Sequence, residues 1–215
     1  MTFWDFCAPF YDFAERRNAK AYNTMVKTVR DVIPGGASVL ELAAGTGSIS
    51  LGIADKVKNI LCTDMSPKML VVARKKAGKR NVKNIDFGNA DIFCINKPDG
   101  AFNVVIAGQV LHLIDEPEKA AAELRRVASG MVILPMSFTK GLKGRAQFML
   151  NIFRLFGFAP KRELALTEYA SFLSGIGFEN CAIIPLEGII PMAVGVWRKS
   201  VLPPSSRLVY ADCSA

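Results

Sequence analysis

Three places in the sequence combine a short apolar run with residues that suit a polar ligand. Glycines stand at alternate positions in AAGTG (residues 43–47), and the backbone of such a turn can approach a ligand closely because glycine has no Cβ atom. The next run ends at Asp64, where a carboxylate can accept hydrogen bonds from both hydroxyls of a ribose. The third run precedes residues 89–91 (Asn-Ala-Asp), whose acid or amide can accept a hydrogen bond from an adenine amino group.

The helix expected from about Ser48 would direct its first N–H groups toward the glycine turn, and these donors suit a carboxylate or a phosphate. Tight turns between strands and helices also use glycine for purely structural reasons, so the turn alone leaves that alternative open. Taken together, the three places suit a ligand that has an amino-acid tail, a ribose and an adenine.

His112 is the only histidine of the chain, and it lies shortly after the fourth apolar run, near Gln109. Histidine is the side chain whose ordinary pKa lies closest to neutral pH, so it is the natural candidate for a general base. In that role His112 would accept a proton from a substrate or orient it. The alternative is a histidine packed at the start of a helix, or one that contacts only a bound cofactor.

The elements that would position these residues alternate between short strands and helices. Runs that are apolar throughout, rather than alternating, indicate strands buried on both faces, as in a parallel sheet covered by helices. Ser66-Pro67 is an N-cap followed by proline at the first helical position, and residues 116–128 have a helical apolar spacing. The sequence predicts a Rossmann-like, doubly wound α/β sheet. Its expected strands are Ser38–Leu42, Asn59–Thr63, Ile85–Gly88, Phe102–Ala107 and Met131–Pro135.

Several segments fall outside this alternation. Residues 1–33 are predicted to form a helical N-terminal cap, and residues 137–176 a helical lid inserted after the fifth strand. FENCAIIPLEGIIPMAVGVWRK (residues 178–199) predicts two strands with a turn between them, which is an antiparallel C-terminal hairpin. We therefore expect a single domain over residues 1–200 and a loose tail over residues 201–215.

Composition limits the classes of protein to consider. Of the 215 residues 51% are hydrophobic, which is ample for a core, and no apolar run reaches the roughly 18 residues that span a bilayer. The first residues carry acidic rather than basic charge before their apolar part, so they do not indicate a secretory signal, and a cytoplasmic protein is expected. The chain has five cysteines and no CxxC pair, so we expect no disulfide framework. With a single histidine and scattered cysteines, we also expect no structural metal site.

The net charge of +8 admits nucleic acid, an anionic membrane surface or an acidic small molecule as partner. Much of that charge lies in RKKAGKRNVK (residues 74–83), which reads as the end of a helix and the loop after it. Basic residues there complement the helix dipole. RNA-binding surfaces usually place exposed aromatic residues among the basic ones, and this run contains none. We therefore expect a solvated surface rather than a nucleic-acid site.

The segments VLELAAGTGSIS, TDMSPKML, NADIF and FNVVIAGQVLHLID resemble, in order, the motifs of class I S-adenosylmethionine-dependent methyltransferases. The resemblance covers about residues 39–134, and the closing hairpin fits it. It is closest in character to the methyltransferases of ubiquinone and menaquinone synthesis, and FYDFAERRN (residues 10–18) is similar to the cap segment of that group. The resemblance implies S-adenosylmethionine as cofactor and S-adenosylhomocysteine as product.

The resemblance also implies roles at the methionine end of the cofactor. Gly45 and Gly47 would line the methionine part, and Glu41 would lie beneath it and hold the loop or the amino group. The family often has glycine at the position of Ala43, where alanine would cost only some close approach. Tyr11 would close the site from the N-terminal helix and is the second candidate for catalysis; the alternative is an aromatic residue of the core.

At the other end of the cofactor, the resemblance places Asp64 on the ribose hydroxyls and Met65 beside the adenine. The segment Asn89, Ala90, Asp91 and Ile92 would hold the adenine edge. Gly108 and Gln109, just after the fourth strand, would face the methionine end and the substrate.

NAD binding is the alternative for the turn itself, because Ser50 satisfies the small-residue position of a G-x-G-x-x-G pattern. The C-terminal hairpin and residues 89–91 weigh against it. So does Glu41, which together with a helix N-terminus suits a free amino-acid end.

The apolar helix expected within GLKGRAQFMLNIFRLFGF (residues 141–158) bears on the acceptor. Three interpretations are open: a helix buried on the sheet, a lid that lines an apolar acceptor pocket, or an interfacial helix that contacts a membrane peripherally. The last two favour a lipophilic acceptor. The predicted function is methyl transfer to a small apolar molecule such as a quinone precursor, a phenol or a lipid-like amine. The alternatives are methyl transfer to nucleic acid or protein, and a non-catalytic module that binds the cofactor.

Overall fold

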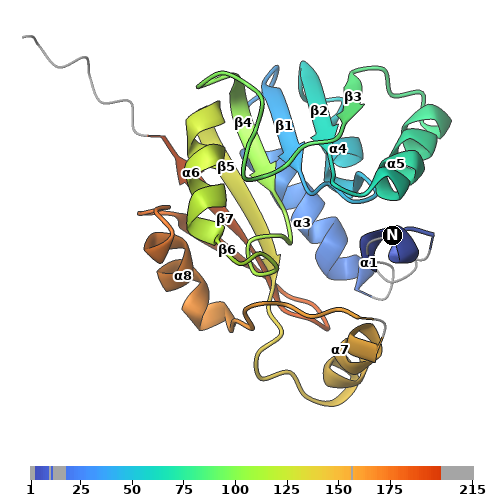
Figure 1. Ribbon diagram of the computed structural model, residues 1–215, viewed down its shortest axis with the longest axis vertical. Helices are drawn as coiled ribbons and strands as arrows, with labels where there is room; N and C mark the ends of the chain where they lie inside the picture. The colour runs from blue at the N-terminus through green and yellow to red at the C-terminus, as the bar shows by residue number, and fades with distance from the viewer. Residues whose placement is uncertain (1–2, 10, 12–17, 156, 200–215) are drawn as a thin grey trace, which may run out of the picture.

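The computed structural model describes residues 3–9, 11, 18–155 and 157–199, the side chains of residues 149 and 153 excepted (Figure 1). Its centre is a seven-stranded sheet in the order β3-β2-β1-β4-β5-β7-β6. The first five strands are parallel, and β7 runs antiparallel to both β5 and β6. The strands are β1 (Ser38–Leu42), β2 (Asn59–Thr63), β3 (Ile85–Gly88), β4 (Phe102–Ala107), β5 (Ala128–Ser137), β6 (Ala182–Leu186) and β7 (Met192–Arg198).

Helices cover both faces of the sheet, which explains why its central strands are apolar throughout. One face packs against α3 (Ala19–Val32), α4 (Ser48–Ile53) and α5 (Pro67–Lys79), and the other against α6 (Pro117–Val127) and α8 (Tyr169–Gly175). The sequence prediction of a doubly wound sheet with an antiparallel hairpin is thus confirmed. The N-cap prediction at Ser66 also holds, since its side chain accepts a hydrogen bond from the Met69 amide at 3.3 Å.

The fifth strand is longer than the sequence predicts. We expected Met131–Pro135, but β5 begins three residues earlier, at Ala128, which pairs with Phe102 of β4. In the structure β5 continues to Ser137, and Met136 and Ser137 pair with Ala193 and Met192 of β7. The antiparallel neighbour therefore extends the strand past the proline.

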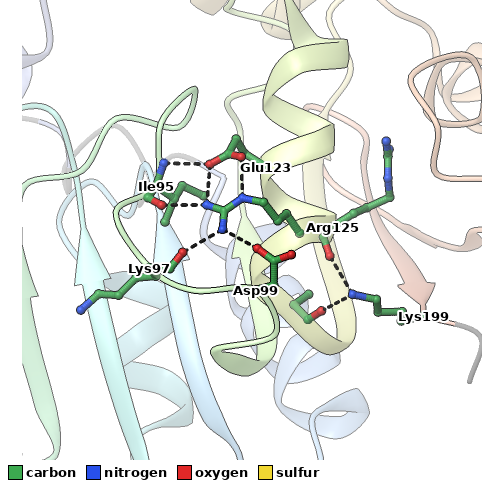
Figure 2. Close-up of polar contacts among 8 residues, drawn as sticks. Ile95, Lys97, Asp99, Glu123, Arg125 and Lys199 are labelled. Atoms are coloured by element: carbon green, nitrogen blue, oxygen red, sulfur yellow. Dashed lines mark hydrogen bonds and ion pairs between the residues drawn. The ribbon is translucent and has the colours of Figure 1, made fainter.

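The connection from β3 to β4 contains no helix, and an arginine of α6 holds it in place (Figure 2). Arg126 donates hydrogen bonds to the carbonyl oxygens of Ile95 and Lys97, both at 2.8 Å, and it forms ion pairs with Asp99 and Glu123. Glu123 in turn accepts a hydrogen bond from the Ile95 amide at 2.9 Å. The loop after the third strand is thus fixed by side chains of α6 where a helix of its own would otherwise hold it.

Two helical segments lie at the carboxyl edge of the parallel strands (Figure 1). They are α1 (Phe3–Cys7) near the N-terminus and α7 (Gly144–Leu155), which follows β5 and precedes the short 3₁₀ turn Leu166–Glu168. Phe148 and Leu155 on α7 are 69% and 84% exposed, so the interpretation of α7 as a helix buried on the sheet is wrong. In the part of the chain that is described, no helix has both the length and the apolar content needed to cross a bilayer. The division into cap, single domain and lid stays a prediction, and the tail over residues 201–215 lies outside the described residues.

Candidate functional site

The turn after β1 has a backbone that few residue types adopt. Gly45 and Gly47 have φ angles of 56° and 75°, and Ala43 has a φ of 52°. These values lie in the left-handed region, which favours glycine. A Cβ atom on Gly47 would also stand 3.2 Å from the Cβ of Ala73 in α5, so space as well as backbone angle requires glycine there. The expectation that alanine at 43 costs only close approach is therefore incomplete, because the position is also conformationally strained.

Asp64 joins the ends of β1 and β2. Its Oδ2 accepts a hydrogen bond from the Gly45 amide and its Oδ1 one from the Ser66 amide, both at 2.8 Å. The side chain is nearly buried, and this burial raises the pKa of the Asp64 carboxyl, while the two amide hydrogen bonds oppose the shift and the nearby Asp5 adds to it. Each carboxylate oxygen still has a lone pair with which to accept a hydrogen bond from a ligand hydroxyl.

The residues after β3 are tied to the same place. Asn89 donates hydrogen bonds from Nδ2 to the carbonyl oxygens of Asp64 at 2.9 Å and Met65 at 3.2 Å. Asp91 is exposed, and its Oδ1 accepts a hydrogen bond from the Phe93 amide at 2.9 Å. The side chain of Ile92 is buried in the core, and that of Ala90 is partly buried against it.

Glu41 lies beneath the glycine turn, buried within β1. Its Oε2 accepts hydrogen bonds from both the amide, at 2.9 Å, and the hydroxyl of Ser50 in α4. These contacts join β1 to α4, and the two roles implied for Glu41, holding the loop or holding an amino group, stay predictions. Ser50, the small residue that also satisfies the G-x-G-x-x-G pattern of NAD binding, is thus hydrogen-bonded to Glu41.

An aromatic cluster from the N-terminal segment covers the turn. The ring of Tyr11 lies 3.8 Å from the position that a Cβ on Gly45 would take. Trp4 packs edge-on against Tyr11 and against Phe158, with ring centroids 6.3 and 6.5 Å apart. Phe6 is exposed, and the neighbouring aromatic residues Phe10 and Phe13 lie outside the described residues.

The loop after β4 carries two buried polar atoms that have no partner among the described residues: Nε2 of Gln109 and Nδ1 of His112. Gln109 has a φ of 57°, and its Oε1 accepts a hydrogen bond from the Ser137 amide at 2.9 Å, which fixes the orientation of its amide group. Gly108 packs beside Ile49 and Pro135. Burial lowers the pKa of His112 to about 4, so its imidazole is neutral at pH 7.

Two contacts at this edge were not foreseen from the sequence. The Ser66 hydroxyl donates a hydrogen bond to Asp5 of α1 at 2.6 Å, and Phe158 joins the aromatic cluster from beyond α7. Asp5 lies 59 positions before Asp64 along the chain, and only the fold brings the two acids together. The acidic residue at position 5 is the one sequence signal for this contact.

The residues present fit an adenosyl ligand with an amino-acid tail. The strand ends of β1, β2 and β3 are joined by hydrogen bonds through Asp64 and Asn89, and Ala43, Ala44 and Gly45 of the turn are partly exposed. A buried amide such as Nε2 of Gln109 costs about 1–3 kcal/mol when no acceptor faces it. A polar group of a bound molecule would remove that cost.

Comparison with known proteins agrees with this geometry. Residues 39–129 match the family model of a methyltransferase domain. The demethylmenaquinone methyltransferase of Thermus thermophilus is 31% identical over 118 residues, covering 54% of this chain and 53% of the relative. The ubiquinone/menaquinone biosynthesis C-methyltransferase of Francisella tularensis is 31% identical over 110 residues, covering 49% and 44%. The chain spans about half the length of the relatives it matches.

Solved structures share the fold over most of the chain. A methyltransferase from Thermotoga maritima, described as a possible histamine N-methyltransferase, has a TM-score of 0.71 at 16% identity, covering 92% of this chain and 99% of that one. The magnesium protoporphyrin IX methyltransferase of Synechocystis, solved with S-adenosylhomocysteine, has a TM-score of 0.66 at 20% identity, covering 87% and 88%. Residues 39–129 are therefore similar to a methyltransferase domain, and the chain shares the fold of these solved methyltransferases.

Proposed function

We propose that this protein transfers a methyl group from S-adenosylmethionine to a small apolar acceptor of the quinone-precursor class. The single observation that supports it most is the junction of β1, β2 and β3 at Asp64. A buried carboxylate there accepts hydrogen bonds from the glycine turn, while Asn89 links the third strand end to the second. A carboxylate beside a glycine turn suits a ribose next to an amino-acid tail.

In this proposal Asp64 holds the ribose, and Met65 and the segment 89–92 hold the adenine. Gly45, Gly47 and Gly108 line the methionine part above Glu41. The bound cofactor supplies a methyl group on a sulfonium sulfur, so that the carbon is already activated. The aromatic faces of Tyr11 and Trp4 beside the turn would favour such a cation through its attraction to their π electrons.

The acceptor end of the proposed site is the loop after β4. Gln109 Nε2 has a fixed orientation as a hydrogen-bond donor and suits an oxygen atom of the acceptor. The imidazole of His112 is neutral at pH 7, but a pKa of about 4 makes it a weak proton acceptor, so in this proposal it orients the acceptor. Tyr11 would close the site over both ligands and exclude water.

The class of acceptor is supported by the relatives, whose names specify demethylmenaquinone or ubiquinone and menaquinone synthesis. It is also supported by the apolar residues of α7, which lie exposed after the fifth strand. Methyl transfer to nucleic acid gains no support, because the charged run 74–83 forms the end of α5 and the loop beyond it.

The test has two arms. Calorimetry with S-adenosylmethionine and S-adenosylhomocysteine measures whether the chain binds the cofactor. Labelled cofactor with a panel of reduced demethylated quinones, phenols, amines, thiols and phospholipids then measures transfer. We expect binding in the first arm and transfer to the quinol or phenol class in the second. Binding without transfer to any acceptor would support a non-catalytic module, and transfer to RNA or protein substrates alone would contradict the proposed acceptor class.

A further inference from the structure

Helix α7 has two unlike faces. Ala146 and Leu150 lie on one side and are buried. Phe148, Ile152 and Leu155 follow the spacing i, i+4, i+7, which places them together on the opposite side. They are 69%, 41% and 84% exposed. A helix that already buries one face thus presents a second apolar face to solvent.

This exposed apolar face is unusual for a surface helix. Large apolar side chains scattered singly over a surface are normal, whereas a contiguous row of them marks a surface that binds something. Phe148 and Leu155 alone account for two of the largest exposures among the apolar residues of the described chain. The row of Phe148, Ile152 and Leu155 therefore favours an apolar binding partner.

Cations surround the row. The stretch of residues 140–162 contains no Asp or Glu, and its basic residues are Lys140, Lys143, Arg145, Arg154, Lys161 and Arg162. Lys140, Arg154 and Lys161 form ion pairs with acidic side chains outside the stretch. Lys143 and Arg145, at the start of α7, are exposed and have no ion-pair partner within the described ranges. An occupant that complements this surface is therefore apolar and anionic.

The position of α7 leaves it accessible. It lies at the carboxyl edge beside α1, below the sheet in Figure 1. The two segments meet where Phe158, just after α7, packs against Phe3 of α1 with ring centroids 6.5 Å apart. No helix or strand of the described chain crosses the outer side of α7 in that view.

We propose that the outer face of α7 binds an anionic lipid bilayer peripherally. Phe148, Ile152 and Leu155 would enter the boundary between headgroups and acyl chains, and Lys143 and Arg145 would lie among the phosphates. Apolar insertion and attraction to the anionic surface then both contribute to binding. The inference is independent of the proposed methyl transfer, because it needs neither cofactor nor acceptor.

The first experiment measures partition of the full chain onto vesicles by flotation, at low ionic strength. One set of vesicles is an equal mixture of phosphatidylcholine and phosphatidylglycerol, and the other is phosphatidylcholine alone. We expect binding to the anionic vesicles and at least about tenfold weaker binding to the neutral ones. The double variant Phe148→Ser with Leu155→Ser should lower the partition coefficient on anionic vesicles by about tenfold or more. The reason is that the apolar area of two large side chains is no longer there to be buried in the bilayer.

Matched controls come from α5 and the loop after it, which are also basic. Val71 is exposed to 60% on α5, and Val71→Ser should leave partition unchanged. Lys143→Glu with Arg145→Glu should lower partition by about tenfold or more, while Lys75→Glu with Lys83→Glu, which changes the net charge equally, should lower it by no more than about twofold.

Three results would overturn the inference. One is equal loss of binding in both pairs of charge reversals, which would indicate attraction by net charge alone. Another is full vesicle binding by the Phe148→Ser, Leu155→Ser variant when circular dichroism shows it folded. The third is self-association of the wild-type chain in sedimentation experiments that this variant abolishes, which would assign the face to a second copy of the protein. If the variant fails to fold, Ile152→Ser alone is tested in its place by the same flotation.

Discussion

Asp64 uses both carboxylate oxygens to hold the turn and the start of α5, so a ribose must share oxygens that already accept a hydrogen bond. We expect Asp64→Asn to weaken S-adenosylmethionine binding by about 1–3 kcal/mol, because the charged acceptor is lost while an amide oxygen remains for one backbone contact. Calorimetry of wild type and variant measures the difference.

Asp86→Asn is the control, because Asp86 is an exposed acid on β3. It should bind the cofactor as the wild type does. Equal affinity for Asp64→Asn and wild type, with both proteins folded by circular dichroism, would show that the ribose is not held at this residue.

Ala43 carries backbone strain that glycine would relieve. An alanine in the left-handed region costs roughly 1–2 kcal/mol. Glycine removes that strain, but its larger loss of backbone entropy on folding offsets part of the gain. We expect Ala43→Gly to raise the free energy of unfolding by about 1 kcal/mol in urea titrations. Ala44→Gly, at a neighbour without a positive φ, should instead lower it by about 0.5–1 kcal/mol. Destabilisation by both substitutions would mean that the strain at 43 is small.

His112 makes stability depend on acid. Burial lowers its pKa from 6.5 to about 4 in the folded protein, so the unfolded chain takes up a proton first as the pH falls. The free energy of unfolding should therefore decrease between about pH 6.5 and pH 4, by about 3 kcal/mol in total, and stay level above that window.

In urea denaturation across this pH range, the His112→Gln variant should not show that decrease in the free energy of unfolding. The chain has no other histidine, so no second imidazole contributes. Asp64 acts in the opposite direction, because its raised pKa lets the folded state bind a proton before the unfolded state does. The difference between wild type and variant isolates His112, and parallel curves for the two proteins would contradict the buried, neutral imidazole.

The main residues of the proposed site were visible in the sequence because each follows an apolar run of strand length. Asp64 and Gly45 could be placed together from the rule that parallel strands end at one edge. Asp5 could not, since it belongs to a short N-terminal helix whose position depends on packing with α5 and Phe158. The strain at Ala43 was equally hidden, because residue type alone suggests an ordinary backbone.

At the scale of elements, the loop between β3 and β4 depends on Arg126, the unlabelled arginine that bonds to Ile95, Lys97, Asp99 and Glu123 in Figure 2. Its hydrogen bond lowers the pKa of Glu123, and Glu123 holds the Ile95 amide. We expect Arg126→Gln to speed exchange of the Ile95 amide hydrogen by at least about tenfold, because the loop can then open locally. Hydrogen exchange followed by mass spectrometry measures this.

Lys119→Gln is the control, since Lys119 pairs only with Glu116 on the exposed side of α6 in the part of the chain described. It should leave exchange at Ile95 unchanged. If Arg126→Gln also leaves it unchanged, the loop is held by apolar packing of Ile92 and Ile95 rather than by the arginine.

The sequence predicted four strands of the sheet with the bounds that the structure has, because each is a short apolar run closed by glycine or polar residues. It began β5 three residues late, at Met131, and ended it two residues early, at Pro135, where the neighbour that extends the strand lies more than fifty residues further along the chain. The face that α7 buries was also beyond prediction, because apolar residues occur on both of its sides.

At the scale of the whole molecule, β7 fastens the sheet to α8. Gly195 of β7 faces α8, and a Cβ there would stand 2.8 Å from Leu173 Cδ1 and 3.1 Å from the Tyr169 hydroxyl. That hydroxyl donates a hydrogen bond to the Leu134 carbonyl of β5. We expect Gly195→Ala to lower the free energy of unfolding by about 1–3 kcal/mol through overpacking.

Gly78→Ala is the matched substitution, because nothing lies within 4 Å of its Cβ position on α5. It should raise stability by about 0.5–1 kcal/mol, as alanine favours a helix. Urea titration of both variants provides the comparison. A Gly195→Ala variant as stable as the wild type would mean that α8 shifts to accommodate the methyl group without cost.

The reversed strand β7 has a consequence for synthesis of the chain on the ribosome. In the described sheet β6 pairs with β7 alone, and β5 has β4 and β7 as its neighbours. Nascent chains emerge from the N-terminus, at about 5–20 residues per second. The segment of β6 therefore leaves the exit tunnel before β7, its only partner in the described sheet. Until β7 emerges, the edge of β5 that pairs with it stays unpaired. A nascent chain arrested before Met192 should thus engage chaperones that bind unpaired strands, and release from them should follow the emergence of Arg198.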